Sequence, residues 1–221
     1  MKLLYKIKLL KYFLLLIFSL TFLNGEKKIF ANNEEQIFNK MLTFLLNSQN
    51  VAMDFIQTDS NENKSYTGTM LISNGKNFRV NYYYPASFLI VGNEYNVSIY
   101  DYDMDSVLRL RGEEYSNIFF LRDYKEFTKN FTIKKHRLKK SLEIFEIFNK
   151  KLQTSVKLAF DIKSKELKTL EIKEYENEIF TNFTKVQKIN FADKELFFIK
   201  NPDRFGPPKR LNKKDLKNFY R

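Results

Sequence analysis

The sequence contains no cysteine and no tryptophan, and its 221 residues include one histidine, six glycines and four prolines. Without cysteine, the chain has no disulfide, no thiolate metal site, no cysteine nucleophile and no lipid-anchored N-terminal cysteine. No G-x-S-x-G, H-E-x-x-H, phosphate-loop or dinucleotide-binding motif occurs in it. These absences argue against an enzyme, and we expect neither a metal nor a cofactor.

Two polar features come nearest to a chemical site. His136 lies among five basic residues between positions 134 and 140, which predicts an exposed side chain on a solvated face. Asp101, Asp103 and Asp105 resemble the start of a calcium loop, but the loop's glycine and its glutamate at the twelfth position are missing. An exported hydrolase is therefore an alternative only if the fold assembles a polar cluster that the sequence does not reveal.

Residues 1–31 are predicted to be a signal peptide, because four lysines precede an uncharged run over residues 12–23. Twelve residues span about 18 Å as a helix, whereas a bilayer crossing needs about 20 residues, so an uncleaved anchor is disfavoured. We expect cleavage after Ala31, with Gly25 as a second small residue at which it would fit. The remaining 190 residues (221 − 31) suit one domain that works outside the cytoplasm.

The chain is basic, with a formal net charge of +12. Export argues against nucleic acid as the partner. The densest basic stretch is the predicted tail over residues 206–221, whose cations would attract anionic lipid headgroups or an acidic protein. The alternative is a solvated tail that only keeps the protein soluble. Its basic residues are Lys209, Arg210, Lys213, Lys214, Lys217 and Arg221.

Hydrophobic periodicity divides the rest of the chain into one long helix and many strands. Apolar residues recur at three- and four-residue spacings from residue 33 to 48, which predicts an amphipathic helix. A period of two begins after Asn50 and predicts strands. Early strands are expected around residues 51–56, 66–72, 78–82, 89–91 and 97–99, and later strands at 131–137, 142–148, 154–161, 167–175 and 179–189.

So many short strands predict a mainly β (α+β) fold, with about eleven strands in one curled antiparallel sheet. We expect an incomplete barrel with a helical lid over residues 32–205. The lid would be the long helix, completed by short helical turns at residues 118–121 and 124–129. A two-layer core that is packed solid is the alternative architecture.

The order of these segments resembles the outer membrane lipoprotein carrier family, LolA, over roughly residues 34–202. The helix leads into a strand with Phe-x-Gln at residues 55–57, and the next strand starts on Gly68. An aromatic strand ending in Tyr-Pro follows at residues 78–85, and a closing Phe-x-x-x-x-Pro segment lies at 197–202. This chain departs from the family in having no tryptophan, in having Gly-Asn at 92–93 in place of Asp-Gly, and in lacking the loop proline near Lys76.

What the resemblance implies is an apolar cavity that shelters the acyl chains of lipoproteins. Residues on alternating strand positions would line it, helix residues would form the lid, and the strand around the aromatic would contact partners. The cavity residues are Met53, Phe55, Met70, Ile72, Phe78, Val80, Tyr82, Leu89, Val91 and Ile99. The lid residues are Met41, Leu42 and Leu45. The partner-contacting residues are Lys76, Phe78 and Arg79.

The implied protein is a monomeric periplasmic carrier. It would take acylated lipoproteins from an inner-membrane ABC transporter and pass them to an outer-membrane receptor where one is present. The alternative is an extracytoplasmic sensor or binder of lipids or lipoproteins built on a similar sheet. Sensors usually carry a second domain, for which the chain leaves little room, so the carrier is favoured.

Overall fold

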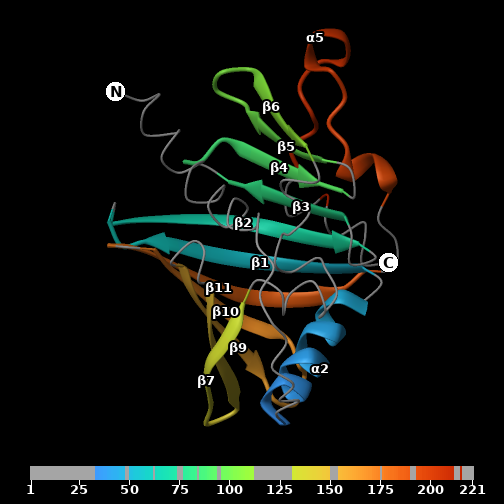
Figure 1. Cartoon of the computed structure of the whole chain (residues 1–221). Coiled ribbons are helices and arrows are strands. Elements are labelled where there is room, and N and C mark those ends of the chain that lie inside the picture. Colours follow the sequence, from blue (N-terminus) through green and yellow to red (C-terminus); the bar gives the residue numbers. More distant parts are fainter. Residues whose placement is uncertain are drawn as a thin grey trace.

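Figure 1 shows the protein as a computed structural model. It describes residues 33–47, 50–61, 63–73, 77–83, 85–93, 96–111, 131–149, 154–174, 176–189, 193–211 and 215. The predicted signal peptide, its cleavage site and the two short helices expected between residues 118 and 129 lie outside these ranges. None of the helices in the described part of the chain is long and apolar enough to span a bilayer.

The described chain opens with helix α2, Asn33–Asn47, as the periodicity predicted. Two acidic residues, Glu34 and Glu35, occupy its first turn, where a negative charge is favourable beside the helix's positive end. Its apolar stripe buries Phe38 and Leu42 almost completely, at 0% and 1% exposed. The helix therefore forms by packing against the sheet and is not an independent surface element.

One antiparallel sheet of eleven strands makes up the rest of the fold. The first six strands are β1 (Asn50–Asp59), β2 (Lys64–Ser73), β3 (Asn77–Tyr82), β4 (Phe88–Gly92), β5 (Asn96–Asp101) and β6 (Ser106–Arg111). The other five are β7 (Thr132–Lys139), β8 (Leu142–Asn149), β9 (Thr154–Asp161), β10 (Leu167–Glu174) and β11 (Asn177–Lys188). The mainly β fold with about eleven strands is confirmed.

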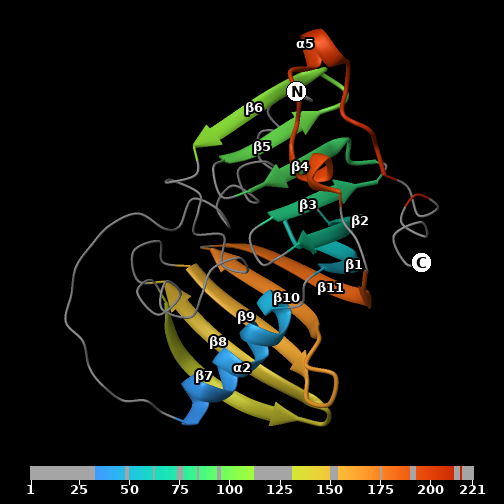
Figure 2. The same ribbon diagram turned by 90° about the vertical axis from the view of Figure 1, so that its right-hand side faces the viewer.

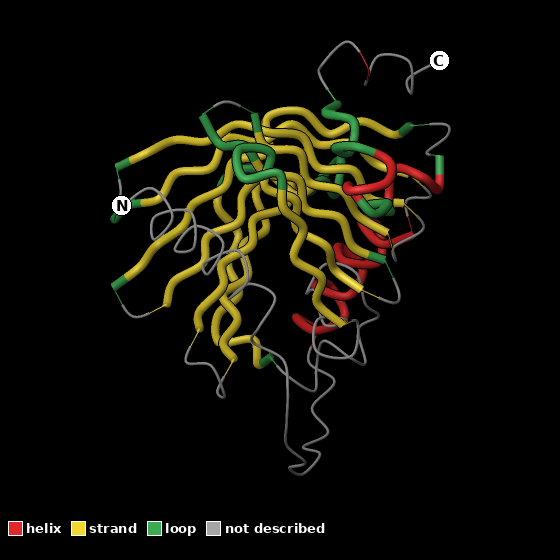
Figure 3. Tube along the Cα trace, turned by 90° about the horizontal axis from the view of Figure 1, so that it is seen from above, coloured by secondary structure: helices red, strands yellow, loops and turns green. Residues whose placement is uncertain are grey.

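The sheet consists of two meanders joined in the middle, in the order β6-β5-β4-β3-β2-β1-β11-β10-β9-β8-β7. The join pairs the first strand with the last, Val51 opposite Lys188 at one end and Asp59 opposite Ile179 at the other. Strands β6 and β7 form the two ends of the sheet, which is not closed into a barrel. Seen from above, the strands splay like a fan, as expected of a strongly twisted sheet (Figure 3).

Helix α2 packs on one face of the sheet, which we call the helix face. Figure 2 shows it lying across strands β7–β11. Alternate residues of nine strands join Phe38, Met41 and Leu42 of the helix in one buried apolar cluster, and Leu110 of β6 and Ile133 of β7 pack against it. Because this cluster draws on all eleven strands, the helix face is the hydrophobic core of the protein.

The opposite face of the sheet differs between its two halves. Over the first half of the sheet it is covered by the C-terminal segment, residues 193–211, which contains the 3-10 helix η1 (Lys194–Phe197) and the short helix α5 (Pro202–Phe205). Buried Phe197, Ile199 and Leu211 pack there in a second apolar cluster. Figure 2 shows η1 over β3 and β4.

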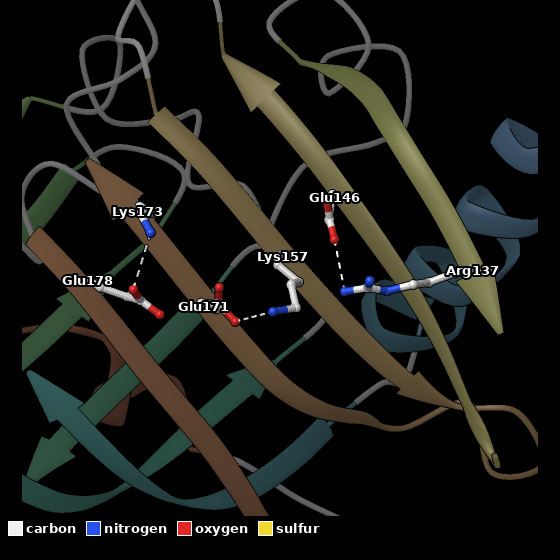
Figure 4. A network of polar contacts seen from close by, with 6 residues as sticks. All are labelled: Arg137, Glu146, Lys157, Glu171, Lys173 and Glu178. Carbon is white, nitrogen blue, oxygen red and sulfur yellow. Dashed lines mark hydrogen bonds and ion pairs between the residues drawn. The ribbon is translucent and has the colours of Figure 1, made fainter. Parts of the chain in front are cut away.

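Over the second half, the opposite face carries ion pairs across neighbouring strands. Glu146 accepts from Arg137 at 2.9 Å, and Glu178 lies 3.5 Å from Lys173, with Lys157 and Glu171 paired between them (Figure 4). Such exposed pairs contribute about 0–1 kcal/mol each. They leave this half of the face to solvent, so the apolar side chains of β7–β11 are concentrated under helix α2.

His136 corrects one sequence interpretation, because its side chain is only 13% exposed. Strand β7 places it opposite Phe145 on the helix face, and the two rings stack at 4.6 Å. Its Nε2 lies 3.0 Å from Oε1 of buried Glu143, and its Nδ1 lies 3.9 Å from Glu34 of helix α2. Its direct neighbours on the strand, Lys135 and Arg137, are exposed, because alternation turns them to the other face while it turns the histidine inward.

Candidate functional site

The helix face of β1–β5 holds most of the predicted acyl-chain residues, in rows that run across the strands. In the central row, Met53 pairs with Met70, Met70 with Val80, Val80 with Ile90, and Ile90 with Ile99. Every member is at most 9% exposed. Directly opposite residues share a face, so these five side chains form one continuous apolar band across five strands.

Two flanking rows complete this face with aromatic rings that lie over glycines. Phe78 lies opposite Gly92, and a Cβ at Gly92 would collide with the Phe78 ring. Phe55 lies opposite Gly68, where a Cβ would collide with the Phe55 ring and the carbonyl oxygen of Asn81. The glycines let the rings lie flat on the sheet, and Phe78 is consequently 2% exposed.

Strand β4 corrects the predicted cavity set. Leu89 and Val91 were expected on the same face as Ile99, but they belong to the second cluster, with Tyr100 and Phe197. Ile90 takes the place on the helix face. All five residues of this strand are buried. Because polar and apolar residues do not alternate in it, the sequence does not show which of its residues face helix α2.

The predicted lid residues Met41 and Leu42 lie in the apolar cluster, 5% and 1% exposed. Leu45 belongs to helix α2, but its side chain is outside what the structure describes. Sequence reasoning missed Phe38, whose ring meets Phe145 edge-on at 4.7 Å. The helical spacing from Phe38 to Met41 and Leu42 was the available signal.

Arg79, a predicted partner contact, is 3% exposed and points to the face opposite helix α2. Its Nε donates to Oδ1 of Asn81 at 2.9 Å, while its NH groups donate to the carbonyls of Leu196, at 3.0 Å, and Lys209. Burial lowers the pKa of Arg79 to about 10, against a smaller opposing influence of Tyr102. The guanidinium therefore fastens the C-terminal segment to β3.

A partner contact by Phe78, Arg79 or Lys76 stays a prediction. Phe78 and Arg79 are both buried, and Lys76 lies outside the described residues.

A polar group interrupts the helix face where β1 ends. Gln57 and Asp59 follow Phe55 at alternate positions and are 7% and 2% exposed. The hydroxyl of Tyr82 donates to Oε1 of Gln57 at 2.7 Å, and Tyr66 is the partner of Gln57 on β2. Burial raises the pKa of Tyr82 above its ordinary value. The strand's own alternation from Val51 onward was the signal that these polar residues face the core.

The aspartates at 101–105 form the tight turn between β5 and β6. Oδ1 of Asp101 accepts from the backbone N–H groups of Asp103 and Met104, at 2.8 and 3.1 Å. Asp105 has a positive φ of 48° and accepts from the hydroxyl of Tyr100. Among the described residues, no group of three or more potential metal ligands comes together. The aspartates therefore stabilise the turn, a common role for this residue type.

Buried tyrosines predict a loss of stability at alkaline pH. Burial and, secondarily, the hydrogen bond to Asp105 raise the pKa of Tyr100 to about 12, and burial also raises the pKa values of Tyr82, Tyr83 and Tyr102. An unfolded tyrosine ionises near pH 10. Between pH 10 and 12 the unfolded chain therefore loses Tyr100 protons that the folded chain keeps, and stability falls.

We expect tyrosinate absorbance at 295 nm from these residues to rise together with loss of the β-sheet circular dichroism signal. Stability measured against pH should fall less steeply above pH 10 in Tyr100→Phe, which has no phenol to ionise. An unchanged slope in this variant would show that Tyr100 ionises freely in the folded protein.

Comparison with known proteins places this chain in a family. The sequence model of the family "Outer membrane lipoprotein carrier protein LolA" matches residues 47–200. An uncharacterised protein of Rickettsia prowazekii (strain Madrid E) is 33% identical over 193 residues, which cover 87% of this chain and 90% of that protein.

Two solved structures are also similar. The crystal structure of MucB gives a TM-score of 0.49 at 9% identity, covering 77% of this chain and 64% of MucB, so this chain spans less than two thirds of MucB's length. A putative outer membrane lipoprotein-sorting protein domain from Vibrio parahaemolyticus gives 0.44 at 10% identity, covering 78% of this chain and 98% of the domain. Because the family pattern runs from the last residue of helix α2 through all eleven strands, the chain belongs to the LolA family of outer membrane lipoprotein carrier proteins.

Proposed function

We propose that this protein is a periplasmic carrier that shelters the acyl chains of lipoproteins on its helix face. It takes them from an inner-membrane ABC transporter and hands them to the outer membrane. The observation that supports this most directly is the unbroken apolar band from Met53 to Ile99, in a chain that belongs to a family of carrier proteins. Residues 1–31 direct export, residues 32–205 form the carrier domain and residues 206–221 form a basic tail.

The energetics of the cargo explain why such a face is needed. Removing a sixteen-carbon chain from water is worth about 12 kcal/mol, at about 0.8 kcal/mol per methylene. An acylated protein therefore crosses an aqueous compartment only when its chains are covered. Release must follow, which favours a surface that adapts over one of tight complementarity. Met53 and Met70, paired at the β1 end of the band, are flexible and polarisable side chains that suit repeated repacking.

Helix α2 acts as the movable cover in this proposal. Phe38, Met41 and Leu42 occupy the apolar cluster over β7–β11, next to the band, so an acyl chain that extends from the band past β1 and β11 gains its place by displacing these helix side chains. The same contacts re-form when the cargo leaves, which lowers the free-energy cost of release. A cover that competes with its ligand makes hand-over reversible.

The test mixes the purified protein with membranes that contain an acylated lipoprotein and its ABC transporter, and measures the soluble one-to-one complex. Met70→Gln puts an amide in the apolar band, and an acyl chain that lies on it offers the amide no hydrogen-bond partner. An amide without a partner costs about 1–3 kcal/mol, so the complex should be about tenfold weaker. Ile56→Gln is the matched control, because Ile56 lies on β1, is 42% exposed and faces away from the band.

No soluble complex with the unaltered protein would end the carrier proposal. A complex that forms but is never passed to outer-membrane vesicles would instead support a sensor or binding protein. If the two glutamine variants lose binding equally, the band is not where the chains lie. Melting curves of both variants show that each is folded in the assay.

A further inference from the structure

We propose that Asp59, at the polar end of the helix face, binds the free α-ammonium group of the cargo's acylated first residue. This inference rests on the proposed carrier function and adds to it a headgroup site with a stated chemical preference. A lipoprotein's first residue carries its acyl chains next to its α-amino group. That amino group is either free and positively charged or itself acylated and neutral. The site would favour the free amine.

The position of Asp59 is unusual for a carboxylate. It is the last residue of β1, lies on the same face as Phe55 and Gln57, and is 2% exposed. Its Oδ1 accepts from the backbone N–H of Asn61 at 2.9 Å. Its Oδ2 is buried and has no hydrogen-bond partner among the residues that the structure describes. An unpaired buried carboxylate oxygen is costly, and natural structures keep few of them without a functional reason.

The neighbours of Asp59 favour a ligand that donates hydrogen bonds. Directly opposite Asp59 lie Lys64 of β2, which is exposed, and Ile179 of β11. At the next position on the same face, Gln57 lies between Tyr66 of β2 and Thr181 of β11. Thr181 is 8% exposed, and Tyr66 is 3% exposed. Gln57, Tyr66 and Thr181 offer amide and hydroxyl oxygens at the register position next to the carboxylate. An ammonium group has three donors and no acceptor, so it matches such a set.

A metal ion fits this place less well than an amine. No second carboxylate or histidine joins Asp59 in a group of three or more ligands among the described residues. A single carboxylate with amide and hydroxyl neighbours is a weak site for a divalent cation, which needs several charged oxygen ligands.

The site also lies where a headgroup must lie if the chains occupy the apolar band. Asp59 lies six positions beyond Met53 of the central row, a distance of about 20 Å along β1. Phe55 lies between them on the same face. Acyl chains that run from the polar end of β1 toward the band would therefore leave the ammonium group at Asp59.

The experiment compares two synthetic lipopeptides that differ at one group. Both carry the same diacylglyceryl cysteine and peptide, one with a free α-amine and the other with that amine acetylated. Titration into the purified protein should give a dissociation constant at least about tenfold lower for the free amine, the scale of one favourable buried charge interaction. In Asp59→Asn, which keeps the side chain's shape and an oxygen for the Asn61 N–H, this preference should disappear.

Asp161→Asn is the matched control. Asp161 also ends a strand and caps a turn, accepting from the N–H groups of Lys163 and Ser164, but it lies outside the helix face. This variant should keep the preference. Without cargo, Asp59→Asn should raise the melting temperature by about 2–4 °C, because it removes a buried unpaired charge.

Equal affinity for the two lipopeptides, or a preference that survives in Asp59→Asn, would overturn the ammonium site and leave the carrier function standing. Failure of the unaltered protein to bind either lipopeptide would refute the carrier function, and the headgroup site with it. A preference lost in both asparagine variants would show a general charge effect and not a site at Asp59.

Discussion

Replacing Phe145 with alanine is expected to lower the free energy of unfolding by about 3–5 kcal/mol, the range for a large aromatic removed from a packed core. Phe145 is fully buried on β8. Its ring meets Phe38 of helix α2 edge-on at 4.7 Å, approaches Phe160 at 6.3 Å and stacks on His136. The loss falls on the helix–sheet contact, so helix α2 should loosen before the sheet unfolds.

Urea unfolding followed by circular dichroism gives the global effect, and hydrogen exchange of residues 33–42 gives the local one. Phe148→Ala is the control, since Phe148 lies on the same strand, faces the other way and is only half-buried. It should cost about 1 kcal/mol. Equal losses in the two variants would mean that the contact of Phe145 with helix α2 adds nothing to the stability of the fold.

The helix and the first three strands were predictable because each shows a single clear period in the sequence. In β1 to β3, most residues on the helix face are apolar, while Asp54, Thr69 and Asn81 between them are polar. The period fixes the type of element and which residues share a face. The same alternation also put Gln57 and Asp59 on the helix face, and that consequence went unrecognised.

Strand β4 was not predictable in the same way, since its two faces are both apolar. Its second face is buried only because Phe197 and Ile199, about a hundred residues later, return to cover it. No local pattern in Phe88–Gly92 reports a contact at that separation. Tertiary structure decides such contacts, and here it decides which residues of β4 lie on which face of the sheet.

Strand β6 and His136 show the effect of charge on a local interpretation. Leu108 and Leu110 alternate with Arg109 and Arg111, a strand period that the many charges obscured. His136 was assigned to solvent by its basic neighbours, although strand alternation separates neighbours onto two faces. In both places, the two-residue period of a strand predicts the structure correctly, whereas the high content of charged residues wrongly suggests an exposed, irregular segment.

Arg79→Met is expected to release the C-terminal segment from the sheet. Methionine keeps much of the length and apolar stem of arginine but donates no hydrogen bond, so the carbonyls of Leu196 and Lys209 lose their buried partner. Two unsatisfied carbonyls should cost about 3 kcal/mol in the local opening of residues 193–211. Since cleavage follows the open fraction, thermolysin should cut within this segment roughly 100-fold faster.

Arg109→Met is the matched control for this variant. Arg109 also donates to the C-terminal segment, to the carbonyl of Ile199 at 2.8 Å, but it is exposed and water replaces its hydrogen bond. Cleavage in this variant should rise only severalfold. If Arg79→Met instead leaves the segment protected while transfer of lipoprotein falls, Arg79 acts on a partner, as the family resemblance suggested. The burial of its guanidinium favours release of the segment, because a side chain that is 3% exposed and already donates three hydrogen bonds within the protein offers little surface to another protein.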